Sequence, residues 1–570
     1  MRLNRLKIEN FRGITSLEIE LDRDITVLIG ENNSGKTTVL EALRFGLETI
    51  KSDKTCNFSE HDFHRNGECN DLASSKPIQL TFYFAETEEY LWPDYCIQTL
   101  NDVIVGSAYA MIKLQLTAQY VASDANLTQS WCFLDDADNE MLGKQGLLKD
   151  LRRLRPFFFQ TALRSAKDEF HGQSTYWSSF LKNKDIDEDT RKTLEEELSN
   201  VNQKIVDAHT SFKDVTEEVK RISELVSVGK ADSVSVDPIA ADVYKALRYT
   251  EVNLLTGSNA KIPIRSHGEG TQSLSVLLLF SAYMKTRLKA DIDKFADPII
   301  AIEEPEAHLH PNAIRALWSL ILTLPGQKII ATHSGDILSE VPVDKLRRLN
   351  KTHTTTECKS IPNNLLSEED LRKFNHHVKR NRGELLFAKY WLLVEGETEV
   401  SVFVECADIL GVNLHQMGIR LIEVSQAGGP SIFIKVADAL GIKWHVVADN
   451  DEGGQRYITA AKTLLDGRKD ADYITQLSSP NTDVLLCRAG YGKPYRDGVV
   501  PQKISELTEP VDSYAYWNQV YKIIKNFRGF SKPAAALEAI LLMKEQGPDG
   551  VPSEIKDILT KLSKIEGDDQ

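Results

Sequence analysis

The sequence has few cysteines, and none of them stand at metal-binding spacing. Seven are scattered through 570 residues without a CxxC pair, so neither a zinc knuckle nor a disulfide framework is predicted. No apolar run approaches the roughly 20 residues that a membrane helix needs. The chain opens on a charged strand instead of a signal peptide. We therefore expect a cytoplasmic protein with reduced cysteines and no membrane contact.

Positive charge is also scarce. The 68 lysines and arginines are outnumbered by 83 aspartates and glutamates, for a formal charge of −15. This balance argues against a surface coated in basic residues, although nucleic acid binding needs only a local positive stripe. With 42% hydrophobic residues and no low-complexity bias, the composition is that of an ordinary globular protein. A length of 570 residues predicts two domains and leaves room for an inserted element.

The N-terminal segment has the pattern of an α/β domain. Strand patterns at RLKIENF, LEIELD and DITVLI are followed by the helical spacing of TTVLEALRFGLETI. Further strand patterns at PIQLTFYFAE, MIKLQLTAQYV and WCFLDD predict an antiparallel sheet beside it. A fresh buried strand, AKYWLLVEG, opens a second α/β unit after a basic segment. We place one domain at residues 1–375 and another at residues 384–570.

A charged segment without proline or glycine, residues 185–226, repeats apolar residues at helical spacing. It predicts a long exposed helix or a helical pair within an insertion at about residues 166–235 of the first domain. Two interpretations stay open: a solvated face packed on its own domain, and a dimerisation element.

A nucleotide-binding motif lies between the strand DITVLI and the helix after it. Residues 30–37, GENNSGKT, fit GxxxxGK[ST] in the strand, loop and helix context that gives this motif its mechanism. Backbone N–H groups of such a loop wrap phosphates, Lys36 reaches the β and γ phosphates, and Thr37 offers a hydroxyl to Mg²⁺. The residues predicted to bind ATP in this loop are Gly30, Asn32, Asn33, Ser34, Gly35, Lys36, Thr37 and Thr38.

Three later segments supply further parts of this site. The apolar strand 299–302 ends at Glu303 and Glu304, at the edge where open α/β sheets bind ligands. Glu303 is predicted to hold Mg²⁺ through water, and Glu304 to orient and deprotonate the attacking water. The strand KIIAT leads to His333, a candidate to hydrogen-bond the γ-phosphate. Residues 265–274, RSHGEGTQSL, precede a helix whose N-terminal amides form a second phosphate-binding end.

In this order, and with the opening IENFRG of residues 8–13, the motifs resemble the ABC-type ATPases of the structural-maintenance, recombination and repair group. The resemblance implies ATP sandwiched between two ATPase domains of a homodimer or a higher oligomer. It also implies that Ser266, Gly268 and Gly270 face the nucleotide of the partner subunit. Glu303 stands where that group usually has the Walker B aspartate, a departure expected to alter Mg²⁺ geometry and slow turnover.

The second α/β unit carries acidic residues at the ends of its strands. The strand before Glu395 turns at Gly396 into a helix with Glu399, and the strand GIKWHVVA leads to Asp449 and Asp451. Carboxylates gathered at one edge repel each other and need compensating positive charge. Hard oxygen ligands suit Mg²⁺ or Mn²⁺, and two such ions can activate water for phosphodiester cleavage. The alternative for these acids is ordinary helix N-terminal and turn chemistry.

An EG motif followed by DxD on successive strands resembles the Toprim domain. Its combination with an upstream ABC-type ATPase resembles the OLD (overcoming lysogenization defect) nuclease family, which includes the Gabija nuclease subunit and some retron effectors. The resemblance assigns metal binding to the four acids named above. It also implies a further acid after DxD, for which Glu506 and Glu509 are candidates, and a lysine at the scissile phosphate, for which Lys532 is the candidate.

Basic clusters lie near the acidic motifs in the sequence, and aromatic residues interleave with two of them. This arrangement predicts a surface that tracks phosphates, and a solvated charged face is the alternative for each single cluster. The clusters are Lys379, Arg380 and Arg382; Arg488, Lys493 and Arg496, with Tyr491 and Tyr495; and Lys522, Lys525 and Arg528, with Phe527.

Together these features predict an ATP-regulated, metal-dependent DNA endonuclease, and the resemblance implies a role in antiphage defence. The predicted fold is α/β: an N-terminal ABC-type P-loop ATPase domain with a helical insertion, and a C-terminal Toprim domain on a Rossmann-like parallel sheet. ATP and Mg²⁺ or Mn²⁺ are the expected cofactors. DNA, further copies of the chain, and an accessory helicase or retron component are the candidate partners. One alternative is an ABC-type DNA-binding clamp without nuclease activity. Another is a Toprim primase or topoisomerase, which the lack of a primase zinc motif and of a tyrosine-bearing winged-helix region disfavours.

Overall fold

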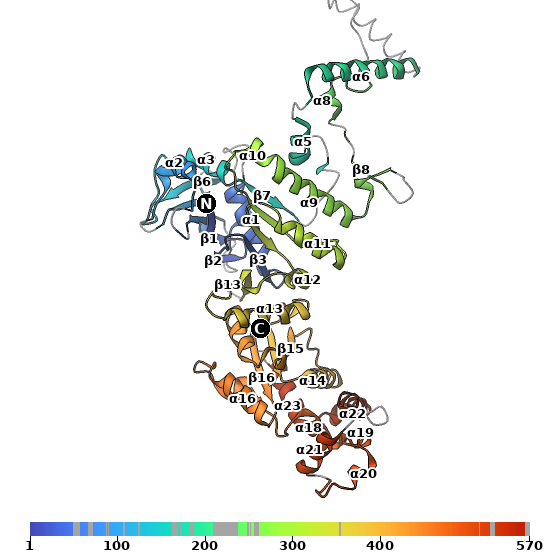
Figure 1. The fold of residues 1–570 in the computed structure, drawn as a ribbon. Helices are drawn as coiled ribbons and strands as arrows, with labels where there is room; N and C mark the ends of the chain where they lie inside the picture. Colours follow the sequence, from blue (N-terminus) through green and yellow to red (C-terminus); the bar gives the residue numbers. More distant parts are fainter. Residues whose placement is uncertain are drawn as a thin grey trace, which may run out of the picture. The chain divides into compact units, whose positions relative to one another are not determined.

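The computed structural model divides into two compact units, and Figure 1 labels many of their elements. It describes residues 1–564 except 49–56, 66–71, 87, 89–90, 107–108, 124–125, 162–168, 171–173, 183–185, 209–237, 248–249, 251, 256–260, 353–354, 512 and 525–530. The first unit comprises Met1–Gly13, Glu20–Ile25 and Thr37–Thr332. The second comprises Ile14–Ile19, Thr26–Lys36 and His333–Gln570.

An antiparallel sheet forms one part of the first unit. Strand β4 pairs with β1 on one side and with β5 on the other, and β5 pairs with β6, all antiparallel. Apolar side chains of these strands are buried, as in a sheet that covers a core. The antiparallel sheet expected from the strand patterns is therefore confirmed. The strands are β1 (Arg2–Phe11), β4 (Ile78–Ala85), β5 (Met111–Val121) and β6 (Asn126–Leu134).

Parallel strands form the other part of the first unit. Strand β10 pairs in parallel with β7 and with β11, and the apolar runs of β10 and β11 are buried. The strands are β7 (Phe157–Gln160), β10 (Ile299–Glu303) and β11 (Gln327–Ala331), with a hairpin of β8 (Asn253–Leu255) and β9 (Lys261–Pro263). The helices are α1 (Lys36–Leu47), α2 (Asp94–Leu100), α3 (Leu147–Leu154), α5 (Thr175–Lys182), α6 (Glu188–Ala208), α8 (Val243–Ala246), α9 (Glu269–Thr286), α10 (Leu288–Asp291) and α11 (Pro311–Leu322).

The predicted long helix corresponds in part to α6. Most of its side chains are exposed, and the buried side chain of Asn202 exchanges two hydrogen bonds with the backbone of Ile239, at 2.6 and 2.8 Å. Residues 209–226 of the predicted helix lie outside the described residues. The choice between a solvated face and a dimerisation element therefore stays a prediction.

The second unit contains two groups of strands. In the first group, β12 pairs in parallel with β3 and antiparallel with β13. In the second group, four parallel strands follow the order β15-β14-β16-β17. The strands of these groups are β3 (Ile25–Gly30), β12 (Leu346–Lys351), β13 (Thr356–Lys359), β14 (Tyr390–Val394), β15 (Ile419–Glu423), β16 (Lys443–Ala448) and β17 (Ile474–Gln476). The unit also includes β2 (Ile14–Glu20), which belongs to neither group.

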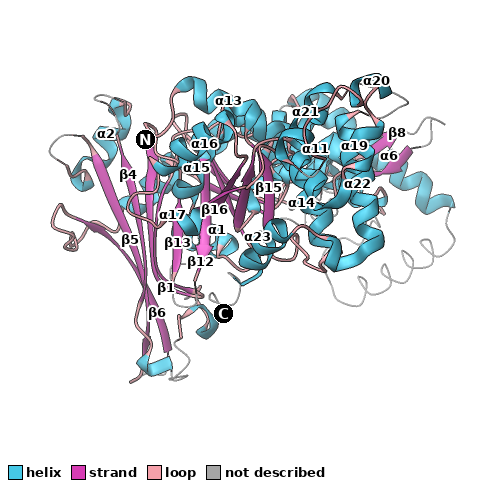
Figure 2. Ribbon diagram, turned by 90° about the horizontal axis from the view of Figure 1, so that it is seen from below, coloured by secondary structure: helices cyan, strands magenta, loops and turns pink. Residues whose placement is uncertain are grey.

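Helices cover the parallel sheet of the second unit, as Figure 2 shows. They confirm the predicted α/β class and the Rossmann-like parallel sheet. The helices are α12 (Gly335–Leu338), α13 (Glu368–Arg380), α14 (Glu397–Ile409), α15 (Ser431–Leu440), α16 (Glu452–Lys462), α17 (Asp470–Tyr473), α18 (Thr482–Leu486), α19 (Lys493–Asp497), α20 (Pro501–Ile504), α21 (Tyr514–Ile523), α22 (Lys532–Gln546) and α23 (Ser553–Lys564), with a π-helical turn η9 (Cys487–Tyr491).

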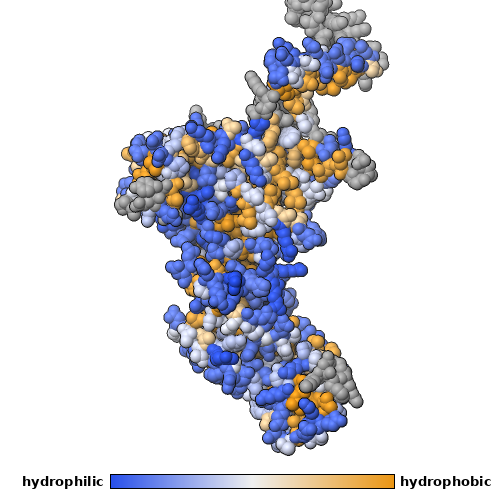
Figure 3. All heavy atoms as spheres, in the orientation of Figure 1, coloured by the Kyte–Doolittle hydropathy of each residue, from blue (hydrophilic) through white to orange (hydrophobic). Residues whose placement is uncertain are grey.

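The C-terminal helices share one hydrophobic core with the parallel sheet. Buried residues of α18, α21, α22 and α23 pack in the same cluster as Tyr390, Leu392 and Val394 of β14. Figure 3 shows hydrophobic residues on the visible face of this helical region, where Leu537 and Leu541 of α22 are each 56% exposed. Within the described residues, no helix is both long enough and apolar enough to cross a membrane.

A buried arginine joins two groups of elements inside the second unit. Arg348 of β12 donates from Nη1 to the carbonyls of Leu440 and Gly441, at 3.0 and 3.2 Å, and from Nη2 to Ala388 O at 2.8 Å. Leu440 and Gly441 end α15, where backbone carbonyls have no helical partner. Burial lowers the pKa of Arg348 to about 10, which still leaves the guanidinium charged at neutral pH.

Replacing Arg348 by methionine should destabilise the second unit. The variant keeps most of the side-chain volume but leaves the buried carbonyl of Ala388 without this donor and removes the bonds to Leu440 and Gly441, of which Leu440 O keeps Asn350 Nδ2 at 3.2 Å. We expect the free energy of unfolding to fall by about 1–3 kcal/mol. Urea unfolding followed by circular dichroism measures this change. Lys373→Ala, which removes an exposed i,i+4 pair with Glu369, is the control and should have a much smaller effect. Equal effects of the two substitutions would contradict the role given to Arg348.

Candidate metal centre and nucleotide site

The first pair of acids lies where β14 meets α14. Strand β14 is buried along its whole length and ends at Val394, so Glu395 stands at the carboxyl edge of the parallel sheet. Gly396 is the extended N-cap of α14, and Glu399 lies in the first turn of that helix. The Gly396 N–H donates to Glu399 Oε2 at 2.8 Å. Glu399 thus caps helix α14. Its side chain is buried at the sheet edge, with 7% of it exposed.

The second pair of acids follows β16, the neighbour of β14. Asp449 comes directly after the strand and is 6% exposed. Asp451 is the N-cap of α16, and its Oδ1 accepts a hydrogen bond from the Gly454 N–H at 2.8 Å. A Cβ on Gly454 would lie 2.0 Å from the Asp449 carbonyl oxygen, so only glycine fits where the helix starts against the strand end.

The structure brings the two pairs together. A Cβ built on Gly453 would lie 3.1 Å from Glu395 Oε1 and 3.2 Å from Asp451 Oδ1, so both oxygens border the same small space. Burial, followed by the charges of Glu399, Glu395 and Asp451, raises the pKa of Asp449 to about 9. Burial, followed by the charges of Asp451 and Glu399, raises the pKa of Glu395 to about 7. The four acids therefore form one strongly repelling cluster.

The chemistry of this cluster suits a divalent cation, but its side chains are not arranged to hold one in this structure. In the described part of the chain, no three His, Cys, Asp or Glu side chains are arranged to hold a metal ion. One oxygen each of Glu399 and Asp451 is bound by a helix N-terminal amide, as in the capping alternative considered from the sequence. Each carboxylate keeps a second oxygen, and the buried Oε2 of Glu395 has no hydrogen-bond partner among the described residues. A hard cation would satisfy this set of oxygens.

A fifth acid, missed by sequence reasoning, belongs to the cluster. Asp483 in the first turn of α18 is 5% exposed, and its Oδ1 accepts a hydrogen bond from the Tyr495 hydroxyl at 2.7 Å. Its charge contributes to the raised pKa of Asp449. Burial, together with the charge of Glu399, raises the pKa of Asp483 itself to about 6, although the Tyr495 hydrogen bond and the charge of Lys532 oppose the rise.

The remaining candidates divide between near and distant positions. Lys532 begins α22, and its charge acts on Asp483, so the lysine approaches the acidic cluster. Its Nζ also lies 3.7 Å from the centre of the Tyr521 ring. Glu506 and Glu509 are exposed, and neither is among the charges that shift the pKa of Asp449. Asp483 is the acid after Asp451 whose charge does act on Asp449.

The expected phosphate-tracking surface is only partly present. Tyr491 and Tyr495 are 2% and 0% exposed and point inward, so the prediction that they interleave with basic residues as a stacking surface is wrong. Their hydroxyls donate instead to Gln546 and Gly550, and to Asp483. Lys525, Phe527 and Arg528 lie outside the described residues.

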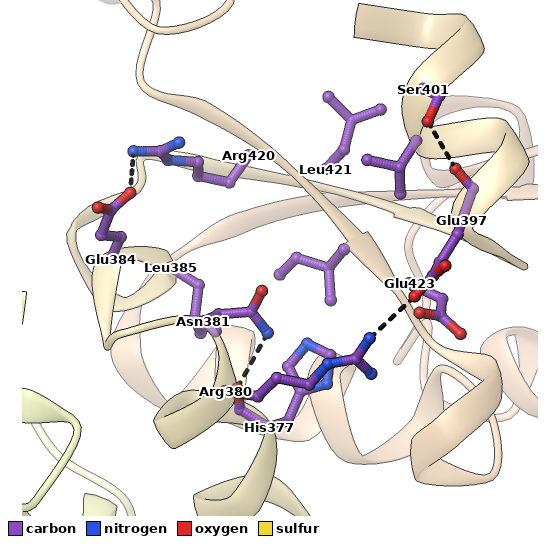
Figure 4. Close-up of a pocket in the computed structure, with 12 residues that line it drawn as sticks. His377, Arg380, Asn381, Glu384, Leu385, Glu397, Ser401, Arg420, Leu421 and Glu423 are labelled. Carbon is purple, nitrogen blue, oxygen red and sulfur yellow. Dashed lines mark hydrogen bonds and ion pairs between the residues drawn. The ribbon is translucent and has the colours of Figure 1, made fainter. Parts of the chain in front are cut away.

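A cavity of about 380 Å³ opens beside α14 and is lined in part by charged residues. Figure 4 shows Arg380 directed at Glu397, and Arg420 directed at Glu384, each pair separated by 2.8 Å. Lys379, next to Arg380 in the sequence, pairs with Glu340 at 3.0 Å. Because acids neutralise these cations, the cavity is not a positively charged phosphate site.

The P-loop has the backbone that its motif predicts. Asn33 and Gly35 have positive φ angles of 65° and 103°, which curl the loop between β3 and α1. Lys36 Nζ donates to the carbonyls of Gly30 and Glu31 at 2.9 and 2.7 Å and so lies along the inside of the loop. Ser34 is buried within the same turn.

The Mg²⁺ candidates of the nucleotide site also meet. Thr37 Oγ1, at the second residue of α1, donates to Glu303 Oε1 at 2.5 Å. Glu304 follows β10 with a φ of 41°, a rare value for a non-glycine residue that marks a constrained position. Thr38 lies in α1, and His333 follows Thr332 at the end of β11.

The small residues of RSHGEGTQSL surround the start of α9. Gly268 is the N-cap of this helix, and Ser266 lies in the turn before it. A Cβ on Gly270 would lie 2.6 Å from the carbonyl oxygen of His308, so close packing already requires glycine there. The adjacent Glu269 contacts His308 Nδ1 at 2.9 Å. The contact of these residues with a partner's nucleotide stays a prediction.

Known proteins are similar to this chain over nearly its whole length. The family model "Protein of unknown function (DUF2813)" matches residues 1–384, and the model "Overcoming lysogenization defect protein-like, TOPRIM domain" matches residues 386–451. The chain is 28% identical to the uncharacterized protein YbjD of Escherichia coli (strain K12), over 99% of this chain and 98% of that protein. It is 25% identical to endonuclease GajA of Bacillus cereus (strain VD045), over 74% and 71%. It is 23% identical to the OLD nuclease of Thermus scotoductus, over 79% and 82%.

Asp449→Asn should stabilise the metal-free protein at high pH. Because the pKa of Asp449 is raised from 3.8 to about 9 in the folded state, the folded protein holds a proton that the unfolded chain releases. Stability should therefore fall as pH rises from about 4 to about 9. We expect the melting temperature of the metal-free wild type to drop over this range, and that of the variant to drop less.

Thermal melts with EDTA, and with added Mg²⁺, measure this effect. Mg²⁺ should raise the melting temperature of the wild type at pH 8 and that of Asp449→Asn much less. Glu509→Gln, which removes an exposed acid, is the matched control and should follow the wild type. If both variants followed it, Asp449 would carry no buried repulsion.

Proposed function

We propose that this chain, which belongs to the OLD family, is an ATP-regulated, metal-dependent DNA endonuclease. The DUF2813 family model spans its residues 1–384. The observation that carries the proposal is the meeting of Glu395, Asp449 and Asp451 at the carboxyl edge of one parallel sheet. In this proposal residues 1–375 form the ABC-type ATPase part, and residues 384–570 form the Toprim nuclease part. Nuclease names among the relatives support the same activity.

The acidic residues have defined tasks in this proposal. Glu395, Glu399, Asp449 and Asp451 hold Mg²⁺ or Mn²⁺, with Asp483 beside them. Ions bound there supply charge stabilisation and an activated water for phosphodiester hydrolysis. The amides at the start of α14 and α16 orient Glu399 and Asp451, which limits the side-chain motion needed to bind. Lys532 places a positive charge next to the acids, where it can bind the scissile phosphate.

The nucleotide residues regulate this centre in our proposal. Gly30 to Thr38 bind the phosphates of ATP, with Thr37 and Glu303 on the magnesium ion and Glu304 as the base that activates water. His333 contacts the γ-phosphate. The glycine-rich start of α9 faces the nucleotide of a second copy, so that ATP binding joins two ATPase parts. We place this enzyme in the cytoplasm and in antiphage defence.

An ABC-type DNA-binding clamp without nuclease activity is the second candidate. The capping roles of Glu399 and Asp451, and the lack of a ready three-ligand metal group among the described residues, favour it. The raised pKa values of Glu395 and Asp449 favour the nuclease. Neither carboxylate caps a helix, so capping does not account for the presence of these two acids at the sheet edge.

Asp449→Ala should abolish metal-dependent cleavage of supercoiled plasmid. Loss of a direct ligand should cost more than the 10- to 100-fold typical of an outer-shell partner, so we expect a drop of at least about 100-fold. Gel analysis of nicked and linear products with Mg²⁺ or Mn²⁺ measures the rate. Glu452→Gln removes an exposed acid three residues away and should keep full activity. Intact plasmid with the wild-type protein under all conditions would favour the clamp, and closed relaxed circles would indicate a topoisomerase.

Substitutions at the nucleotide site should separate ATP binding from hydrolysis. Lys36→Ala should weaken both, because its ammonium group lies inside the P-loop. Glu304→Gln should keep ATP bound and slow hydrolysis by roughly 100-fold or more, the effect of losing a general base. Filter binding and phosphate release measure the two steps. Lys289→Ala, an exposed lysine on α10, is the control, and normal hydrolysis in both site variants would remove the assignment.

A further inference from the structure

A second cavity, of about 310 Å³, lies in the C-terminal helical region and has a different electrostatic character. Among the described residues, its lining contains three basic side chains, Arg488, Lys493 and Arg496, and no acidic one. Gly490, Gly492 and Trp517 form part of its wall. We call this cavity the basic pocket.

The basic residues of this pocket have no acidic partner. No carboxylate of the described residues pairs with Arg488, Lys493 or Arg496, and all three are exposed. Arg488 instead lies over the Tyr514 ring, 3.6 Å from its centre. By contrast, both arginines of the cavity in Figure 4 are paired with glutamates. In a chain with a formal charge of −15, three unopposed cations in one hollow form a local site for an anion.

The wall of the basic pocket is anchored to the core. The π-helical turn η9 carries Arg488 and contains Gly490 with a φ of 104°, a conformation that favours glycine. A Cβ on Gly492 would lie 2.1 Å from the Trp517 ring, so the backbone packs directly on that ring.

The basic pocket is continuous in the chain with the acidic cluster. Helix α18 begins with Asp483 in its first turn and runs directly into η9, so five residues of helical backbone separate Asp483 from Arg488. At 1.5 Å and about 100° per residue, Arg488 lies roughly 7.5 Å further along the axis than Asp483 and on a different side of the helix, so the basic pocket and the acidic cluster are separate sites on one helical run. The Tyr495 hydroxyl, from the helix that carries Lys493 and Arg496, donates to Asp483 at 2.7 Å.

We propose that the basic pocket binds a backbone phosphate of DNA. This phosphate belongs to the strand whose scissile phosphate lies at the acidic cluster, and the two are different phosphates of that strand. The inference rests on the proposed nuclease function and adds the residues that position its substrate. Arg488, Lys493 and Arg496 are positioning residues, because they contact the DNA backbone and not the reacting phosphate. Their binding is independent of base sequence, since phosphates carry no sequence information.

The salt dependence of DNA binding tests this inference. A labelled DNA duplex is titrated with the full-length protein in Ca²⁺ over a range of salt concentrations, by fluorescence anisotropy. In the variant Arg488→Ala, Lys493→Ala, Arg496→Ala we expect at least a 10-fold loss of affinity. The slope of log affinity against log salt should shrink by about 1 for each phosphate that the variant no longer binds.

A matched variant controls for net charge. Lys373→Ala, Lys462→Ala, Lys544→Ala removes the same charge from exposed lysines that are paired with acids, and it should keep the wild-type slope. An equal loss of affinity in the control, or an unchanged slope in the pocket variant, would overturn the inference. Melting temperatures of both variants should match the wild type, and a charge-reversed Arg488→Glu should weaken binding further.

The same measurements separate this inference from the proposed nuclease. Plasmid cleavage by the wild type together with an unchanged slope in the pocket variant would reject the basic pocket and keep the nuclease. A reduced slope in the pocket variant without cleavage by the wild type would keep the pocket as a DNA site and reject the nuclease. No binding by the wild type at any salt concentration would reject both.

Discussion

Electrostatic repulsion among carboxylates at one sheet edge governs the C-terminal part of this protein. Strands β14 and β16 are parallel neighbours, so the acids that follow them, Glu395 and Asp449, are forced to the same edge. Asp449 is buried there and Glu395 is half-buried. Burial raises the free energy of each ionised carboxylate, and repulsion from its ionised neighbours raises it further. The cluster must therefore hold protons or cations. Divalent cations held there would also activate water for hydrolysis of a phosphodiester.

The helix N-termini at this edge make the crowding tolerable. Glu399 and Asp451 accept hydrogen bonds from the first amides of α14 and α16, and the dipoles of both helices favour negative charge there. Capping fixes one oxygen of each carboxylate and leaves the second oxygen without a helix amide. The caps hold Glu399 and Asp451 in place without a bound cation.

Strong local signals in the sequence are enough to predict the main sites. A buried apolar run followed by an acid predicts the positions of Glu395 and Asp449, because parallel strands end at a common edge. Asp483 escapes sequence reasoning because it follows β17, which has only three residues and leaves no readable period. The inward direction of Tyr491 and Tyr495 is equally hidden. Spacing along the chain shows which residues are close, but only packing decides which side of a helix meets the core.

The distribution of cations explains how an acidic chain can hold a polyanion. Arg380 and Arg420 are matched by glutamates, and Arg348 is used internally on backbone carbonyls. Positive charge therefore serves the structure at these positions, and the net charge of the chain repels DNA. A strand that reaches the acidic cluster needs cations that no acid opposes, and Arg488 lies on the helical run that also carries Asp483. Cations on that run favour binding of DNA that reaches the cluster.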